Sequence, residues 1–222
     1  MTLYNRIQNS IVHRIQKYTN KYLGKLRLSN LKSKSFTVIS NNCWAGSVYR
    51  YYNLPYNSPT VGLYFFSRDY IKFLNNLRYY CTHRIECIDV SQSKYRELLI
   101  SKHQENVPIG RIDDIEVIFL HYSSFAEAKE KWQRRVNRIV WGNLFIKMSE
   151  MNGCTIDDIY EFDKLPFENK VIFTTRDYGI KSQVIMKQWK GDNQIKDDTT
   201  WFNKYIDITA FLNGCLKRRR QK

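Results

Sequence analysis

The sequence has no acidic residue before Asp69, although it contains 21 aspartates and glutamates in all. Residues 1–35 carry eight lysines and arginines, and the last six residues carry five more. Between these ends the chain has 23 basic and 21 acidic residues, so residues 36–216 are nearly neutral. The formal charge of +15 is therefore concentrated in two basic ends. This distribution argues against a basic groove that follows a nucleic-acid backbone, and we do not expect nucleic acid as a partner.

Long apolar runs and paired cysteines are also missing. The five cysteines include no Cys-x-x-Cys pair, so we expect reduced thiols and no metal site. No apolar run approaches the roughly 18 residues that span a bilayer, and the amino terminus lacks the apolar core of a secretory signal. These absences predict a cytoplasmic protein.

Several well-known catalytic motifs are absent as well. The chain has no Gly-x-Ser-x-Gly elbow, phosphate-binding loop, dinucleotide fingerprint or His-Glu-x-x-His motif, and no motif identifies a cofactor. Its acidic pairs are adjacent, unlike the Asp-x-Asp spacing of many metal-dependent glycosyltransferases. We interpret them as exposed carboxylates of loops and helix starts: Asp113-Asp114, Asp157-Asp158 and Asp197-Asp198.

The first 35 residues predict a basic amphipathic helix. Cations such as Arg14 and Lys21 lie mostly off a stripe of apolar side chains that recur three or four residues apart. The stripe consists of Leu3, Ile7, Ile11, Ile15, Tyr18 and Tyr22. Such a helix suits the anionic inner face of a membrane, where the protein would be peripheral. The alternative is that the stripe docks on the protein's own core.

The remaining chain predicts an α/β fold, with a mostly parallel sheet flanked by helices in three layers. Residues 36–216 form one domain, preceded by the basic segment 1–35 and followed by a basic tail, 217–222. Strands are expected at 36–40, 61–66, 85–90, 115–121, 143–148, 171–174 and 183–188. Helices are expected at 47–54, 69–80, 93–102, 124–140, 156–162 and 201–212, and residues 108–110 are expected to form a turn.

The junction after the first predicted strand is the first candidate site. Asn41, Asn42, Cys43 and Trp44 lie between that strand and a helix, at the carboxyl end of the sheet where ligands bind in open α/β folds. Free N–H groups at the helix start would attract an anion and lower the pKa of the Cys43 thiol. We take Asn42 and Cys43 as catalytic candidates, and Asn41 and Trp44 as substrate contacts. An inert, buried cysteine is the alternative.

Polar residues also follow the other predicted strands, and a parallel sheet would bring them to the same edge. His121 is the foremost partner for Cys43, either as the base for a thiol nucleophile or as a general base acting alone on a sugar hydroxyl. Arg68 and Arg176 would hold a phosphate or carboxylate, unless each pairs with the aspartate beside it. The remaining substrate-binding candidates are Ser67, Asp69 and Tyr122. A structural histidine is the alternative for His121.

Seven segments resemble a bacterial family of unknown function, domain of unknown function family 1919, whose members are often labelled exopolysaccharide biosynthesis proteins. They are residues 40–46, 59–65, 69–74, 119–122, 131–135, 143–145 and 162–167. The resemblance implies an α/β fold and a role in making capsule or exopolysaccharide. We expect a transferase or processing enzyme that moves an acyl or glycosyl group to a sugar precursor, from an anionic donor, at the cytoplasmic membrane face. A non-catalytic binding or scaffolding subunit of the assembly machinery is the alternative.

Overall fold

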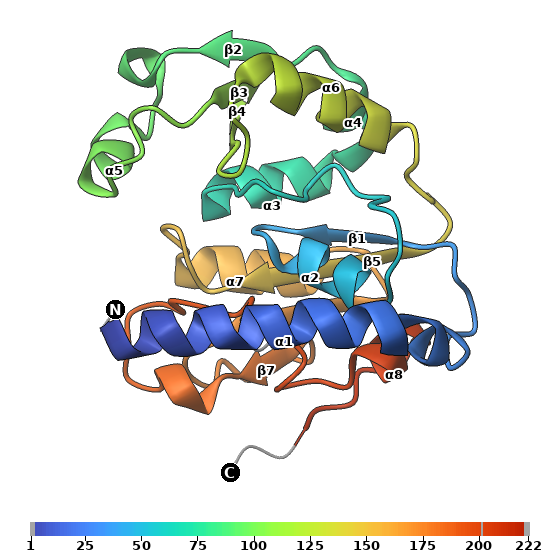
Figure 1. Cartoon of the computed structure of the whole chain (residues 1–222). Helices are drawn as coiled ribbons and strands as arrows, with labels where there is room; N and C mark the ends of the chain where they lie inside the picture. The colour runs from blue at the N-terminus through green and yellow to red at the C-terminus, as the bar shows by residue number, and fades with distance from the viewer. Residues whose placement is uncertain (1–2, 201, 220–222) are drawn as a thin grey trace.

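The computed structural model describes residues 3–200 and 202–219, which form two sheets. The four-stranded parallel sheet has the order β1 (Thr37–Ser40), β5 (Leu144–Ser149), β6 (Lys170–Thr174) and β7 (Gln183–Ile185). A smaller antiparallel sheet consists of β2 (Glu86–Ile88), β3 (Ile109–Ile112) and β4 (Ile115–Ile118). Figure 1 shows the antiparallel sheet above the parallel one, with α3 between them.

Helices cover both faces of the parallel sheet, which confirms the predicted α/β class. Along the chain the helices of the described residues are α1 (Leu3–Leu28), α2 (Trp44–Tyr51), α3 (Ser67–Asn75), α4 (Leu77–Thr82), α5 (Arg96–Ser101), α6 (Phe125–Val136), α7 (Ile156–Lys164) and α8 (Ile208–Leu212). Two short 3-10 turns, η1 (Val90–Gln92) and η2 (Lys187–Trp189), complete the structure. The predicted last helix is shorter than expected, and Trp201 lies outside the described residues.

The core divides along the two faces of the parallel sheet. Alternate strand residues such as Val38 and Phe145 pack against α2 and α8, while Ile39 and Ile146 pack against α3, α6 and α7. A strand buried on both faces needs apolar residues at nearly every position. This explains why β1, β5 and β6 appear in the sequence as mainly apolar runs and are predicted correctly.

Three features of the sheets differ from the prediction. Residues 61–66 are not a strand, because this segment passes between the two sheets and forms only one isolated bridge, from Tyr64 to Ile118. The segments around β2 and β4 belong to the antiparallel sheet and not to the parallel one. The turn expected at 108–110 is instead the start of β3, where a Cβ at Gly110 would collide with Ile85 and Phe119.

Helix α6 begins as its sequence predicts. The Ser124 hydroxyl accepts a hydrogen bond from the Glu127 N–H at 3.2 Å, which caps the helix. Two ion pairs between residues four apart lie along the helix, Glu127 with Lys131 and Glu130 with Arg134. The helix ends at Val136, four residues earlier than expected.

Helix α1 packs on the body through its polar side. Gln16 donates a hydrogen bond to the Thr200 carbonyl and Arg27 donates one to the Tyr51 carbonyl, each at 2.9 Å. Ile15, Tyr18 and Tyr22 are 57%, 69% and 72% exposed, so this part of the apolar stripe does not dock on the core. The side chains at positions 3, 7 and 11 lie outside the described residues. Among the described residues, no helix is both long and apolar enough to cross a membrane.

Candidate functional site

Three backbone N–H groups at the start of α2, after the junction with β1, already have partners within the chain. The Trp44 N–H donates to the Asn42 side chain at 3.2 Å, the Ala45 N–H to the Ser40 hydroxyl at 3.2 Å, and the Gly46 N–H to the Cys43 carbonyl at 3.1 Å. These three N–H groups are therefore not available to an anion, because side chains and a carbonyl of the chain already accept from them.

Cys43 occupies the N-cap position of α2, where we expect a lowered pKa. Burial and the nearby Asp198 carboxylate instead raise the pKa of the Cys43 thiol to about 11, and the cations Arg50 and Lys147 only partly offset them. The thiol is therefore protonated near neutral pH. Its Sγ lies 3.7 Å from the Leu63 carbonyl, to which it donates a weak hydrogen bond.

Beneath Cys43 lies a buried ion pair between Lys147 of β5 and Asp198. Both side chains are essentially inaccessible to solvent, and Asn42 connects them: Lys147 Nζ donates to its carbonyl oxygen at 3.0 Å, and its amide donates to Asp198 at 2.7 Å. The Ser149 hydroxyl donates to the same carboxylate at 2.5 Å. Burial lowers the pKa of Lys147, and the attraction of Asp198 opposes this shift. These four residues form the buried polar cluster.

The interpretation of Asp198 as an exposed loop carboxylate is wrong, because its partner comes from a strand 51 residues away. The sequence does contain a signal for this pairing. Lys147 interrupts an apolar strand of a parallel sheet, where each face is covered by helices. A cation at such a position requires a buried counter-charge, although the sequence does not show which carboxylate supplies it.

His121 lines the same two cavities as Cys43, but it does not follow a strand of the parallel sheet. It follows β4 of the antiparallel sheet, and its N–H is held by the Gly62 carbonyl at 3.0 Å. Two cavities share His121, Cys43 and Thr199 as lining residues, one of about 450 Å³ and the other of about 240 Å³. We call these the cationic cavity and the polar cavity. His121 is accessible to solvent, and within the described part of the chain its imidazole has no hydrogen-bond partner.

Partial desolvation and the positive charge of Arg50 lower the pKa of His121 below its ordinary value of 6.5. The imidazole is therefore neutral at pH 7 and able to accept a proton.

The cationic cavity takes its name from Arg50, Lys131 and Arg135. Lys131 forms an ion pair with Glu127, but Arg50 and Arg135 have no carboxylate partner among the described residues. Arg135 is only 7% exposed. Its guanidinium donates to the Val61 carbonyl at 2.9 Å and to the Tyr122 hydroxyl at 2.5 Å. A buried cation without a counter-ion is costly, and a bound anion would supply the missing charge.

Tyr122 and Tyr56 add aromatic surface to this cavity. The Tyr122 hydroxyl donates to the Val61 carbonyl at 2.5 Å, next to Gly62, which has a φ of +83°. A Cβ at Gly62 would lie 3.0 Å from the Tyr122 hydroxyl, so both the backbone conformation and the close approach require glycine there. The Tyr56 ring lies 5.1 Å from the Arg135 guanidinium. Flat rings beside cations are suited to contact with a sugar or a base.

The structure separates the predicted site residues into two groups. Asn42, Cys43, His121 and Tyr122 line the two cavities, whereas the others lie elsewhere. Asn41 is buried and exchanges two 3.0 Å hydrogen bonds with the Ser149 backbone. The side chain of Trp44 is fully buried in the core, where its indole N–H donates to the Phe202 carbonyl.

The start of α3 holds three predicted substrate contacts, Ser67, Arg68 and Asp69, of which the last two have structural partners instead. Arg68 pairs with Glu161 at 2.5 Å and lies 3.5 Å from Asp158. Asp69 is buried, pairs with Lys94 and accepts the N–H of Glu116. Ser67 is buried beside them and lines neither cavity. Arg176 lines a third cavity, which is separate from Cys43 and His121.

Sequence reasoning missed Arg50, Lys131 and Arg135, because each lies inside a helix and not after a strand. The described residues contain no group of three or more His, Cys, Asp or Glu side chains arranged to hold a metal ion.

The chain belongs to the family called domain of unknown function (DUF1919), which matches residues 14–213. An uncharacterized protein of Haemophilus influenzae is 34% identical to it over 198 residues. This match covers 89% of the chain and 88% of the relative. Both cavities lie within the region that the family match covers.

Proposed function

We propose that the protein is a transferase that binds an anionic donor in the cationic cavity and moves a group to a hydroxyl held in the polar cavity. One observation carries this proposal: Arg135 is buried in the wall of the cationic cavity without a carboxylate partner among the described residues. Together with Arg50 and Lys131 it supplies the positive charge that a phosphate or diphosphate requires. Volumes of 300–1,000 Å³ are typical of small-molecule sites, so about 450 Å³ suffices for such a donor.

His121 is the proposed general base, because it lines both cavities and is neutral at pH 7. It takes the proton of the acceptor hydroxyl while that oxygen bonds to the transferred carbon of the donor. The bond from this carbon to the leaving group breaks, and the leaving group keeps the electron pair. The cations of the cavity hold the departing anion, and the proton on His121 is later released to it or to solvent.

A glycosyl donor with a nucleoside diphosphate and an acyl donor with a phosphate-bearing carrier share this requirement for cations. The polar cavity offers amide groups from Gln104 and Asn152 for a sugar hydroxyl. The resemblance noted in the sequence suggests a precursor of a surface polysaccharide as the acceptor. A covalent route through Cys43 is the alternative. The raised pKa of Cys43 keeps its thiol protonated near neutral pH, which makes it a weak nucleophile.

The test is a thermal-shift screen with nucleotide-sugars, acyl-coenzyme A and inorganic diphosphate, followed by turnover assays on any donor that binds. We expect a donor to raise the Tm of the wild-type protein, and Arg50→Gln to weaken its binding about ten-fold. Arg96→Gln, an exposed arginine on α5 outside both cavities, is the matched control. If no anion binds, or if both variants lose affinity equally, the proposal fails.

A second function, attachment to an anionic membrane, is supported by the outer side of α1. Its apolar side chains Ile15, Tyr18, Tyr22 and Leu26 are between 57% and 72% exposed, and Arg14, Lys21 and Lys25 lie beside them. Exposed apolar stripes flanked by cations are typical of helices that lie in a membrane interface. This surface suits a transferase at the inner membrane face as well as a non-catalytic scaffolding subunit.

Vesicle sedimentation tests the membrane surface. We expect the double variant Tyr18→Ser, Tyr22→Ser to bind phosphatidylserine vesicles more weakly than the wild type, while Tyr160→Ser, an exposed tyrosine on α7, binds normally. Equal binding of all three proteins would exclude α1 as the contact. If the Tyr18→Ser, Tyr22→Ser variant binds vesicles weakly but still turns over its donor, the enzyme proposal stands independently of the membrane.

A further inference from the structure

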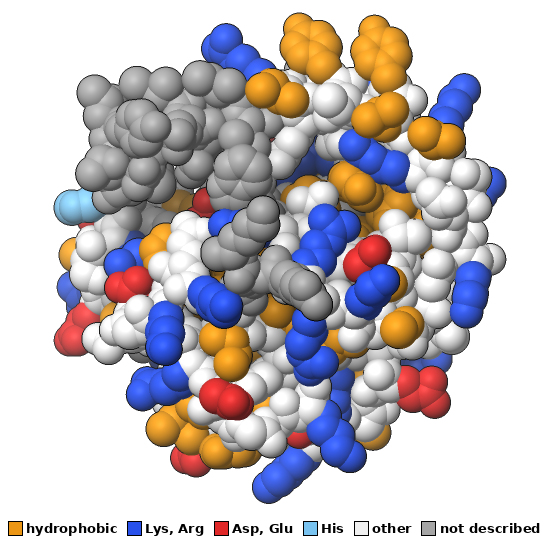
Figure 2. Space-filling view, turned by 90° about the horizontal axis from the view of Figure 1, so that it is seen from below, with side chains coloured by type: hydrophobic (Ala, Val, Ile, Leu, Met, Phe, Trp, Pro, Cys, Tyr) orange, Lys and Arg blue, Asp and Glu red, His pale blue; other side chains and the backbone are white. Residues whose placement is uncertain are grey.

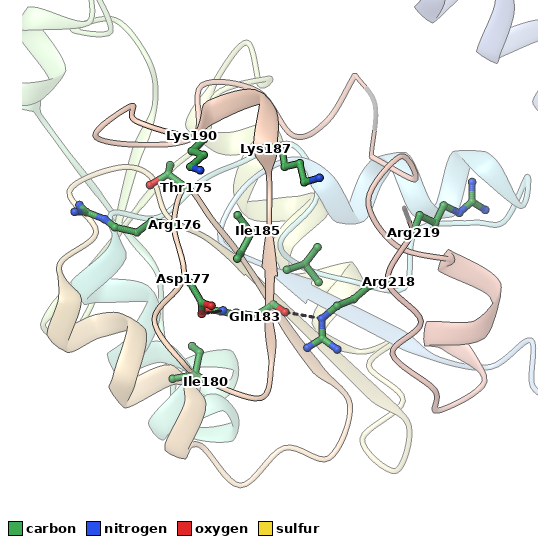
Figure 3. Close-up of a pocket in the computed structure, with 11 residues that line it drawn as sticks. Thr175, Arg176, Asp177, Ile180, Gln183, Ile185, Lys187, Lys190, Arg218 and Arg219 are labelled. Atoms are coloured by element: carbon green, nitrogen blue, oxygen red, sulfur yellow. Dashed lines mark hydrogen bonds between the residues drawn. The ribbon is translucent and has the colours of Figure 1, made fainter. Parts of the chain in front are cut away.

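A third cavity, of about 730 Å³, lies beside the edge strand β7, away from Cys43 and His121. Its walls come from the loop after β6, from β7 and η2, and from the C-terminal segment (Figure 3). Figure 2 shows the lower end of the molecule, where Figure 1 places β7 and the C-terminal segment, and Lys and Arg side chains outnumber acidic ones there.

The charge of this cavity is strongly positive. Five of its lining residues are cations and one is a carboxylate: Arg176, Lys187, Lys190, Arg218, Arg219 and Asp177. Hydrogen bonds from the Gly179 N–H and the Gln183 side chain lower the pKa of Asp177, so this carboxylate is ionised. Within the described residues, Arg176 and Lys190 have no carboxylate partner. An incoming anion would therefore meet several cations at once.

Arg218 is held in place by the free edge of the sheet. It donates to the Gln183 carbonyl at 2.9 Å and to the Lys181 carbonyl at 2.7 Å, and Figure 3 shows the first of these bonds. The guanidinium thus occupies edge carbonyls that another strand would otherwise pair with. The cation is fixed by the fold, although residue 218 lies in the segment that we predict as a basic tail.

The same cavity has an apolar side. Ile180, Val184 and Ile185 line it, and Val184 belongs to the core on one face of the parallel sheet. In Figure 3, Thr175, Arg176 and Lys190 lie toward one end of the cavity and Ile180 lies at the other, with Ile185 between them. A ligand with a charged head and an apolar body matches this arrangement better than a fully polar anion does.

We propose that this cavity binds an amphiphilic phosphate, with the phosphate near Arg176 and Lys190 and the apolar chain against Ile180 and Val184. The proposal is independent of the transferase site, because the two cavities share no lining residue. The ligand is either a free amphiphile or the headgroup and first carbons of a membrane lipid. Both sources have the same chemistry at this site.

Isothermal titration calorimetry with three small probes tests the combination of head and chain. We expect octyl phosphate to bind the full-length protein at least ten-fold more tightly than inorganic phosphate, which lacks the chain, or octyl glucoside, which lacks the charge. Burial of two or three methylene groups is enough for a gain of this size. If inorganic phosphate or octyl glucoside binds as tightly as octyl phosphate, the proposal is overturned.

Variants locate the binding. The double variant Arg176→Gln, Lys190→Gln is expected to weaken octyl phosphate binding at least ten-fold, whereas Arg84→Gln, an exposed arginine that pairs with Glu86 near β2, leaves it unchanged. Arg50→Gln, in the cationic cavity, is also expected to leave it unchanged. If Arg50→Gln loses octyl phosphate binding while the double variant retains it, the ligand lies in the transferase site and the proposal is overturned.

Vesicles distinguish the two sources. If phosphatidic acid vesicles bind the wild type more tightly than the double variant, and octyl phosphate competes with them, the ligand is a membrane lipid. If octyl phosphate binds and the two proteins bind vesicles equally, the ligand is a free amphiphile. Both results support the amphiphile site, and failure of octyl phosphate to bind at all would overturn it.

Discussion

Two groups of polar side chains meet beside Cys43, and they differ in how many of their polar and charged atoms have partners within the protein. In the buried polar cluster, Lys147, Asp198, Asn42 and Ser149 bond to one another, and their charges balance. In the cavities above it, the His121 imidazole has no hydrogen-bond partner in the described chain, and Arg135 has no counter-ion there. Groups that satisfy one another hold a structure together, while groups left without partners are available to a ligand. The comparison assigns stability to the first group and binding to the second.

Breaking the ion pair of the buried polar cluster is expected to have the largest effect on stability. Asp198→Asn leaves Lys147 charged or forces it to lose its proton in a site closed to solvent. Removal of one partner from a buried pair typically costs about 3–5 kcal/mol of folding free energy. Urea denaturation followed by circular dichroism measures this loss. Asp192→Asn breaks an exposed pair with Lys196 and should cost below about 0.5 kcal/mol.

The double variant Lys147→Met, Asp198→Asn sharpens this prediction. Since it removes both charges, we expect it to lose less stability than the sum of the two single variants. Additive losses would mean that the pair is not coupled, and a neutral effect of Asp198→Asn would contradict the structural role.

Removal of the proposed base is expected to affect activity but not folding. His121→Asn should lower kcat by about 10²–10⁴-fold on a donor found in the screen, the usual contribution of a general base. Its Tm should stay close to that of the wild type, because the imidazole makes no hydrogen bond within the described residues. A large fall in Tm with unchanged kcat would reverse the assignment of the two groups.

The lowered pKa of His121 gives this prediction a pH dependence. The base must be neutral, so kcat/KM should fall on the acid side with a midpoint below 6.5. Between the pKa of the folded protein and that of the unfolded chain, the unfolded chain holds more protons, so this residue makes stability increase with pH. A pH–rate profile measures the midpoint, and a value at or above 6.5 would contradict the neutral base at pH 7.

The sequence predicts the parallel sheet better than the site, for physical reasons. β1, β5 and β6 carry their own signal, because burial on both faces makes each a run of apolar residues. β3 lacks such a run, and residues 61–66 have one without being a strand, because neighbouring segments bury them. The pairing of Lys147 with Asp198 and the meeting of Arg50 with Arg135 depend on tertiary contacts. His121 and Cys43 line the same two cavities, although His121 follows β4 of the antiparallel sheet and not a strand of the parallel one.

The smallest expected effect concerns Cys43, which lies between the two groups. With a pKa of about 11, about one thiol in a thousand is ionised at pH 8, so iodoacetamide should label Cys43 more slowly than the exposed Cys87 and Cys215. Peptide mapping by mass spectrometry measures the three rates. Because the Asp198 charge helps to raise this pKa, Asp198→Asn should speed the labelling of Cys43 in protein that is still folded. Cys43 reacting first in the wild type would instead favour the covalent route, since a thiolate would then be present at the boundary of the two groups.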